Sequence, residues 1–408
     1  MRMKIPNNMN PAYQPFLKRF SIAFFLFFLV VQSTFAQFTT LSPQAKASLI
    51  TFGPGTDLYS GFGHSALWVY DPVTGVDGAY SYGTFKFDEG NFYLKFLRGS
   101  LPYTISVAPM APHIAFYRAE NRSISEQVLN LSQAQKQKLY NYLETNYLPQ
   151  NRAYQYLFFY DNCATRLVDA LKAAAGDSLI YNGYTKEKRS FRQWIDKYAY
   201  KQNPWADFGM DLAIGTQADE IATAEQATFL PDNLADAFAA AKIKTAAGVA
   251  PLVISKSDIF TAEPIQYKGI FTPMVTFWTL AVLVLALSYW QISKGIVDFT
   301  LDKILFSIAG LAGWILVLLW AIRTDETTRW NYDLLWAFPL WMPLIFFFSK
   351  NKKPAWFQFL LIFYGFLLLC ATGNVAKHNL VLIPILLMLI VRVYYINNSL
   401  SKIPLKDK

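Results

Sequence analysis

Cys163 is the side chain of this sequence best placed to act as a nucleophile. It follows Asp161 and Asn162 at the start of a predicted helix over 162–175, with one of these two as the N-cap and Gly176 as the stop. The helix dipole and the free backbone N–H groups there stabilise a thiolate, so we expect a lowered thiol pKa. The same N–H groups can hold an oxyanion. Taken alone, Cys163 could equally be an inert core cysteine.

His64 is the candidate base for this thiol. It stands in the segment Gly-Phe-Gly-His-Ser, residues 61–65, between a glycine-rich approach and a predicted strand. An imidazole at the start of a strand, opposite a cysteine at the start of a helix, is the pair that nucleophilic thiol catalysis requires. For His64 alone, a buried structural histidine is the alternative, and His113 is interpreted as structural. Together the two residues predict an enzyme that forms a covalent intermediate on sulfur.

A third polar group usually orients the base in such enzymes. Residues 65–69 and 79–87 predict the two strands of a hairpin. Cross-strand partners share a face, so residues of the second strand are expected beside His64. The candidates on that strand are Tyr80, Tyr82 and Thr84. Tyr82 is our choice as the third catalytic residue.

The expected substrate contacts surround this pair. Arg166 lies one helical turn beyond Cys163 and could contact an anionic head group or pair with Asp169. The predicted substrate-binding residues are Arg166, Asn162, Asp161, Ser65 and Trp205. The chain has 3 histidines, which form no ligand cluster, and no phosphate-binding glycine loop, so we predict neither a metal nor a cofactor.

Composition points to a membrane protein rather than a soluble one. Hydrophobic residues make up 53% of the 408 residues and charged residues 16%, which is too apolar for an ordinary soluble protein. Cys370 lies in a long apolar run, so it cannot plausibly pair with Cys163. The net charge of +9 does not indicate a nucleic-acid partner, because no basic run alternates with aromatic residues outside the apolar segments.

The chain divides into three predicted parts. Residues 1–36 are typical of a secretory signal cleaved after Ala36, with an uncleaved anchor helix as the alternative. Residues 37–265 form the exported domain and residues 266–408 the membrane domain. Five apolar runs predict five membrane helices, near 272–292, 304–322, 333–349, 355–373 and 379–397.

The loops between the apolar runs set the predicted orientation. Lysines gather in the segments that are inside if the first domain is exported: Lys294, Lys303, Lys350, Lys352, Lys353, Lys402, Lys406 and Lys408. By the positive-inside rule the protein is a multi-pass inner-membrane protein with a periplasmic domain and a cytoplasmic C-terminus. Charge within the runs is rare, and Arg392 is expected to snorkel, so an anchor is favoured over a transporter.

The exported domain is predicted to be α+β. Besides the hairpin, strands are expected over 103–107 and 123–129. Further helices are expected over 132–147, 190–200, 217–227 and 232–246.

Two family resemblances follow from these motifs. Gly63-His64-Ser65 before Asn162-Cys163 resembles the circularly permuted branch of the NlpC/P60 papain-like superfamily. The closer resemblance is to the Lnb N-terminal periplasmic domain of lipoprotein N-acyltransferases of the Bacteroidota type. It rests on the segments 61–65, 80–85, 158–166, 203–212 and 229–231. This resemblance implies a permuted papain-like periplasmic domain followed by about five transmembrane helices.

The Lnb resemblance also implies a reaction and its partners. Cys163 would take an acyl chain from a membrane phospholipid as a thioester, and the α-amine of a diacylglyceryl-cysteine lipoprotein would then accept it, with His64 moving the protons. A thiol hydrolase of cell-wall peptide or lipid esters is one alternative, and a non-enzymatic membrane-anchored receptor or assembly factor is another. The sequence leaves the oligomeric state open.

Overall fold

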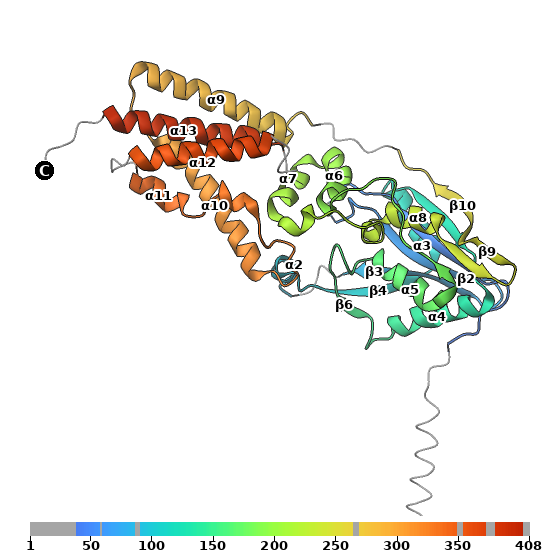
Figure 1. The fold of residues 1–408 in the computed structure, drawn as a ribbon. Coiled ribbons are helices and arrows are strands. Elements are labelled where there is room, and N and C mark those ends of the chain that lie inside the picture. Colours follow the sequence, from blue (N-terminus) through green and yellow to red (C-terminus); the bar gives the residue numbers. More distant parts are fainter. Residues whose placement is uncertain are drawn as a thin grey trace, which may run out of the picture. The chain divides into compact units, whose positions relative to one another are not determined.

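The computed structural model describes residues 38–57, 59–85, 90–263, 269–348, 354–372 and 380–402. The predicted signal segment and its cleavage site lie outside these residues. Within the described chain a sheet-based domain comes first and a group of apolar helices follows (Figure 1). The mixed α and β composition expected for the first domain is confirmed.

A seven-stranded antiparallel sheet organises the first domain. Its strands lie in the order β10 (Val253–Phe260), β5 (Ile124–Leu129), β1 (Lys46–Phe52), β2 (His64–Asp71), β3 (Val76–Thr84), β4 (Pro102–Ala108) and β6 (Ala153–Gln155). The strands expected at 65–69, 103–107 and 123–129 are confirmed. The strand expected at 79–87 is confirmed as far as Thr84, and residues 86–87 lie outside the described part of the chain.

Different helices cover the two faces of this sheet. Phe52 and Ala66 pack with Tyr117 of α3 (Met110–Ala119) on one face. On the other face, the Tyr80 hydroxyl donates to Glu144 of α4 (Gln133–Tyr147). That face also receives α5 (Thr165–Ala175) and α8 (Pro231–Ala240). The sheet therefore separates a layer holding α3 from a layer holding α4, α5 and α8.

The helices expected at 132–147 and 190–200 are confirmed as α4 and as α6 (Phe191–Gln202). Each begins with a capping box, in which Ser132 or Ser190 and a glutamine three residues later bond each other's backbone N–H groups. The sequence expectations did not include α2 (Phe92–Arg98), α3 or α7 (Pro204–Ala213).

The helix expected over 217–227 is wrong. Two short 3-10 turns, Thr216–Asp219 and Gln226–Phe229, stand in its place. Between them Ile221 forms a β-bridge with Ser190, so an extended pairing replaces helical hydrogen bonds. The alanine-rich composition favours a helix, and tertiary pairing overrides it.

The helix expected over 232–246 is correct only in its first part. It ends at Ala240, and the chain continues as β8 (Lys242–Thr245) in a small sheet with β7 (Leu179–Ile180) and β9 (Gly248–Pro251). Ile243 is fully buried in this sheet. Burial of that β-branched side chain favours the strand over continued helix.

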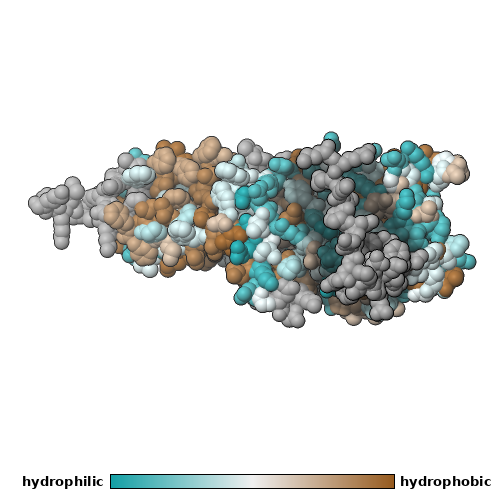
Figure 2. All heavy atoms as spheres, turned by 90° about the horizontal axis from the view of Figure 1, so that it is seen from below, coloured by the Kyte–Doolittle hydropathy of each residue, from teal (hydrophilic) through white to brown (hydrophobic). Residues whose placement is uncertain are grey.

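The described residues of the second part contain five α-helices: α9 (Pro273–Lys294), α10 (Thr300–Ile322), α11 (Trp341–Phe348), α12 (Pro354–Thr372) and α13 (Leu382–Lys402). Among the described residues, three helices are long and apolar enough to cross a membrane, namely those of 273–294, 300–322 and 382–400. Figure 2 shows apolar atoms gathered over this helical part and more hydrophilic atoms over the sheet domain. The remaining two of the five expected spans stay predictions.

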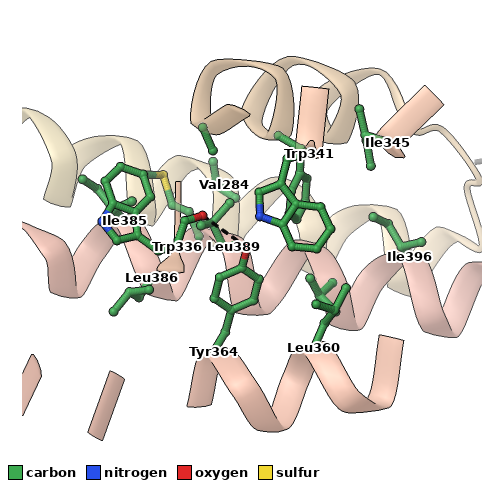
Figure 3. Packing of buried hydrophobic residues seen from close by; sticks show 14 of the residues in the cluster. Val284, Trp336, Trp341, Ile345, Leu360, Tyr364, Ile385, Leu386, Leu389 and Ile396 are labelled. Carbon is green, nitrogen blue, oxygen red and sulfur yellow. Dashed lines mark hydrogen bonds between the residues drawn. The ribbon is translucent and has the colours of Figure 1, made fainter. Parts of the chain in front are cut away.

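Aromatic and aliphatic side chains from α9, α10, α11, α12 and α13 form one core cluster. Trp341 lies beside Tyr364 of α12, whose hydroxyl donates to the carbonyl of Trp336 over 3.4 Å (Figure 3). Leu389 of α13 and Val284 of α9 complete the contacts around these rings (Figure 3).

Arg392 corrects one prediction from the sequence. It does not snorkel, because it is fully buried and its guanidinium donates to both carboxylate oxygens of Asp302 over 2.7 and 2.6 Å. It also donates to Ser288 over 3.0 Å and to Gln291 over 2.7 Å. The side chain therefore links α13 to α9 and α10, and a buried charge with partners needs no route to the surface.

Asp302→Ala is expected to destabilise the helical part strongly. It removes the counter-charge of Arg392 while leaving the guanidinium buried, which costs about 3–5 kcal/mol. Thermal unfolding of the full chain in detergent measures this loss. The double variant Asp302→Leu with Arg392→Leu is expected to lose much less. Equal losses for the single and the double variant would contradict an ion pair at this place.

Candidate active site

Cys163 lies where the neighbouring strands β2 and β3 separate from each other. The β2–β3 ladder ends at the pair Leu67 and Tyr80, so the backbone of Ser65 and Gly83 beyond it is free of that ladder. A Cβ on Gly83 would stand 3.5 Å from the Cβ of Cys163. The thiol therefore occupies the opening between the strands, beside the residue that follows His64.

The turn before α5 places the thiol there. The Asn162 side chain accepts the backbone N–H groups of Ala164 and Thr165 over 2.8 and 3.0 Å, but the N-cap of the helix is Ala164 and not Asp161 or Asn162 as expected. Its amide donates to the carbonyls of Phe158 and Phe229. The regular helix begins at Thr165 and stops before Gly176, so Cys163 stands in the turn ahead of the first helical turn.

Four neighbouring groups lower the pKa of the Cys163 thiol through hydrogen bonding. They are the backbone N–H groups of Ser65, Cys163 and Ala164, and the hydroxyl of Tyr156. Each of them favours the thiolate over the thiol. The same donors can stabilise negative charge on an oxygen of a bound acyl group.

The expected lowering of the thiol pKa is wrong. Burial outweighs the four donors and raises the pKa of Cys163 to about 11. The residue is 7% exposed, so a charged sulfur would lose most of its hydration. A thiol in this state carries its proton at neutral pH, and it needs a base in order to attack.

The imidazole of His64 bonds a different residue from the one predicted. Its Nε2 lies 2.6 Å from the Oγ of Ser81. Among the described residues, this hydroxyl and not the thiol is its hydrogen-bond partner. The register explains the choice, because Trp68 pairs with Ala79, and His64 and Ser81 lie an even number of residues from that pair along their own strands. Side chains alternate between faces, so His64 and Ser81 share one face.

Tyr82 therefore cannot orient His64 by the expected cross-strand contact. It lies on the opposite face with Tyr80, where its ring contacts Tyr154 and the guanidinium of Arg166. A turn of four residues follows Asp71, so even-numbered residues of β2 face odd-numbered residues of β3. The length of that turn was the sequence signal that could have identified Ser81.

His64 is held as a neutral base. Burial, together with the charges of Arg122 and His113, lowers its pKa from 6.5 to about 3. The residue keeps partial exposure, while its ring stacks at 6.1 Å on Phe52. The imidazole is therefore neutral at pH 7, with one ring nitrogen free to accept a hydrogen bond.

Arg122 is a site residue that sequence reasoning missed. It is 5% exposed, its Nε donates to the carbonyl of Gly53 over 2.8 Å, and its guanidinium lies over the ring of Tyr117. Its Nη2 has no hydrogen-bond partner among the described residues. No local pattern marks it, since its position next to His64 arises only from the pairing of β1 with β5.

Arg166 and Asp161, both predicted to bind substrate, bind each other. Nε and Nη2 of Arg166 donate to the two carboxylate oxygens of Asp161 over 2.5 and 2.8 Å, so the alternative pairing with Asp169 is wrong. The turn before α5 brings Asp161 back over the helix. The guanidinium also lies 3.6 Å from the centre of the Tyr154 ring.

Two other residues, Ser65 and Trp205, were also predicted to bind substrate, and they lie in different environments. Ser65 contributes its backbone N–H to the sulfur, and its hydroxyl is buried without a hydrogen-bond partner in the described part of the chain. Trp205 lies on α7, donates to the carbonyl of Phe271 over 2.7 Å and packs on Phe277 of α9. The described contacts of Trp205 include neither Cys163 nor His64.

The rate at which iodoacetamide alkylates Cys163 is expected to depend on His64 at neutral pH but not at high pH. With a thiol pKa of about 11, roughly one sulfur in ten thousand is ionised at pH 7, so the reaction needs the imidazole. Because the pKa of His64 lies at about 3, the rate should show no loss through pH 6.5 on acidification. The rate at each pH is measured by quenching the alkylation after set times and quantifying the modified protein by mass spectrometry. A fall by half near pH 6.5 would contradict a neutral, buried base.

Comparison with known protein families agrees with the two-part organisation. Residues 34–193 match the family described as the Lnb N-terminal periplasmic domain, and residues 265–402 match the Lnb transmembrane domain. No curated protein and no solved structure matches the chain, so the permuted papain-like arrangement stays a prediction. The first match contains His64 and Cys163, and the second contains α9 to α13. The chain belongs to the Lnb family and is a membrane protein with a periplasmic domain.

Proposed function

We propose that this protein is a lipoprotein N-acyltransferase, with Cys163 as nucleophile and His64 as general acid and base. The proposal rests on the surroundings of Cys163. Four groups stabilise its thiolate by hydrogen bonding, and one of them is the backbone N–H of Ser65, the residue after His64. The neutral imidazole of His64 is itself hydrogen-bonded to the hydroxyl of Ser81. Membership of the Lnb family and the apolar helices support a substrate that resides in the membrane.

The first half-reaction transfers an acyl chain to sulfur. In the tautomer that we propose, Nε2–H of His64 donates to Ser81, 2.6 Å away, and the lone pair of Nδ1 takes the thiol proton. The sulfur attacks the carbonyl carbon of a phospholipid ester, and the oxyanion is held by the N–H donors around Cys163. The ester C–O bond breaks, and the imidazolium returns the proton to the departing alcohol. The products are a thioester and a lysophospholipid.

The second half-reaction releases the thioester to an amine. The α-amine of a diacylglyceryl-cysteine attacks the thioester carbonyl, and the C–S bond breaks. His64 removes a proton from the nitrogen and delivers it to the sulfur. The amide product carries the acyl chain, and Cys163 returns to its protonated state. Low exposure of the sulfur favours this aminolysis over hydrolysis, because water is kept from the intermediate.

Access to the sulfur requires movement of a neighbouring side chain, because Cys163 is 7% exposed. We assign this movement to Tyr156. Its hydroxyl bonds the sulfur, and its residue is partly exposed. Its ring stacks on Tyr103 at 4.4 Å, so an aromatic surface adjoins the thiol and suits an acyl chain.

The short helix α2 supports a lipid donor. Leu94, Phe96 and Leu97 are 52, 48 and 44% exposed on it. The carbonyl of Arg98 at its end accepts the backbone N–H of Thr324, two residues after α10 ends. Exposed apolar side chains beside the end of a membrane helix are suited to contact the acyl region of a bilayer. In the proposed orientation the bilayer is the inner membrane, with the C-terminus in the cytoplasm.

Mass spectrometry of lipoproteins tests the proposal in cells. Cells lacking this protein should accumulate lipoproteins with a free α-amine, and the full chain should restore the N-acyl group. Retention of fully triacylated lipoproteins in its absence would overturn the proposal, provided that no second N-acyltransferase gene is present. In vitro, the purified chain should form lysophospholipid and N-acyl lipopeptide in equal amounts, whereas free fatty acid alone would indicate a hydrolase.

A further inference from the structure

Three aspartates of α6 and α7 form a cluster that the proposed reaction does not use. Asp196 lies on α6, and Asp207 and Asp211 lie one turn apart on α7. One carboxylate oxygen of each residue lies within 4.8 Å of those of the other two. The two helices are joined at Asn203, so the cluster closes a short helical hairpin.

Asp207 is buried, and one of its carboxylate oxygens has no hydrogen-bond partner among the described residues. The residue is 5% exposed, and that oxygen is its Oδ1. The Oδ1 of Asp196 is likewise buried without a partner in this part of the chain. A buried carboxylate oxygen left without a partner is destabilising, so folds seldom retain it without a ligand or a proton.

The neighbouring cation does not balance this charge. Arg192 donates to Asp219 over 2.8 Å and to Asp211 over 3.3 Å. Its other N–H groups donate to the carbonyls of Asp211, Ile214 and Gly215. One guanidinium therefore stands against four carboxylates, and its hydrogen bonds are directed away from Asp196 and Asp207.

A proton is the competing occupant of the cluster. Burial, followed by the charges of the neighbouring aspartates, raises the pKa of Asp196 to about 8 and that of Asp207 to about 7. Asp196 also shares a hydrogen bond with Asp211. A metal-free cluster would thus hold protons near neutral pH, and a cation that binds there must displace them.

We propose that Asp196, Asp207 and Asp211 bind one hard divalent cation, Ca²⁺ or Mg²⁺, with water completing its coordination shell. Carboxylate oxygens are the ligands that these ions prefer, and a cation supplies the two unpaired oxygens with the partner that the fold lacks. The ion ties α6 to α7, and α7 carries Trp205, which packs on α9. The inference is independent of the acyltransferase proposal. The prediction of no metal rested on the 3 histidines, and histidine spacing gives no signal for a site made of carboxylates.

Thermal unfolding of the full chain in detergent tests the proposal. The protein is treated with EDTA, freed of chelator, and measured alone, with CaCl₂ and with MgCl₂. We expect at least one ion to raise the Tm by about 5 °C or more at saturation, because it binds the folded state only. Elemental analysis after dialysis against that ion should find about one ion per chain. The ion with the larger shift identifies the preferred ligand.

Asp207→Asn is the decisive variant, and Asp177→Asn, which removes an exposed carboxylate, is its matched control. Asp207→Asn should lose the ion-dependent rise in Tm, and Asp177→Asn should keep it. If wild-type protein has the same Tm in EDTA as with either ion, or if Asp207→Asn keeps the response, the proposal is overturned. A higher Tm for Asp207→Asn with no ion response would show a proton in the cluster instead. If Asp207→Asn does not fold, the wild-type titration and Asp196→Asn decide.

Discussion

Replacing Cys163 by alanine is expected to abolish both acyl-enzyme formation and lipoprotein N-acylation. In the proposed reaction the sulfur is the atom that carries the acyl chain as a thioester. We expect a loss of at least about 10⁴-fold in N-acylation, in the range found when a catalytic nucleophile is removed. Intact-mass analysis of the protein after incubation with phospholipid vesicles measures the thioester directly.

Cys370→Ala is the matched control, because it removes the chain's other cysteine from α12. It should retain the thioester and the activity. Cys163→Ser keeps most of the volume at the site and separates lost chemistry from lost packing. If folded, membrane-inserted Cys163→Ala still restores N-acylated lipoproteins in cells, the protein acts as a receptor or assembly factor and the enzymatic proposal fails.

His64→Ala is expected to slow thioester formation by about 10²–10⁴-fold at pH 7, the usual loss on removing a general base. The reason is the protonated state of Cys163, whose raised pKa leaves few thiolates without a base. Quenched-flow mass analysis of the acyl-enzyme gives the rate. As the pH approaches 11 the thiolate forms without help, so the difference between His64→Ala and wild type in alkylation by iodoacetamide should shrink.

Ser81→Ala tests the positioning of that base. Loss of one hydrogen bond to His64, worth about 1 kcal/mol, should slow thioester formation about fivefold to tenfold at pH 7. Ser81→Thr keeps the hydroxyl and should recover most of the rate, and Tyr82→Phe should not mimic Ser81→Ala. A smaller effect for His64→Ala than for Ser81→Ala, or a deficit of His64→Ala that persists at pH 11, would contradict the assigned roles.

The candidate nucleophile and base of this protein were readable from short segments of its sequence. The histidine at a strand start and the Gly176 stop are local features that the structure contains, whereas the helix expected from Asn162 begins only at Thr165, two residues after the thiol. The apolar runs identified α9, α10 and α13 because a membrane helix is specified by length and composition alone. The family followed from the same segments and is confirmed by both family matches.

Only the tertiary structure decided how these groups work together. Strand register chose Ser81 over Tyr82 as the partner of His64, and burial chose a protonated thiol over a thiolate. Two other outcomes also depend on residues far apart in the chain. Arg392 is buried because it pairs with Asp302, and a β-bridge from Ile221 to Ser190 stands in place of the helix expected over 217–227. Register, desolvation and ion pairing depend on residues far apart in the chain, whereas caps and apolar length depend on neighbours. This is why the sequence alone determined the candidate nucleophile and base, and the fold determined their protonation and orientation.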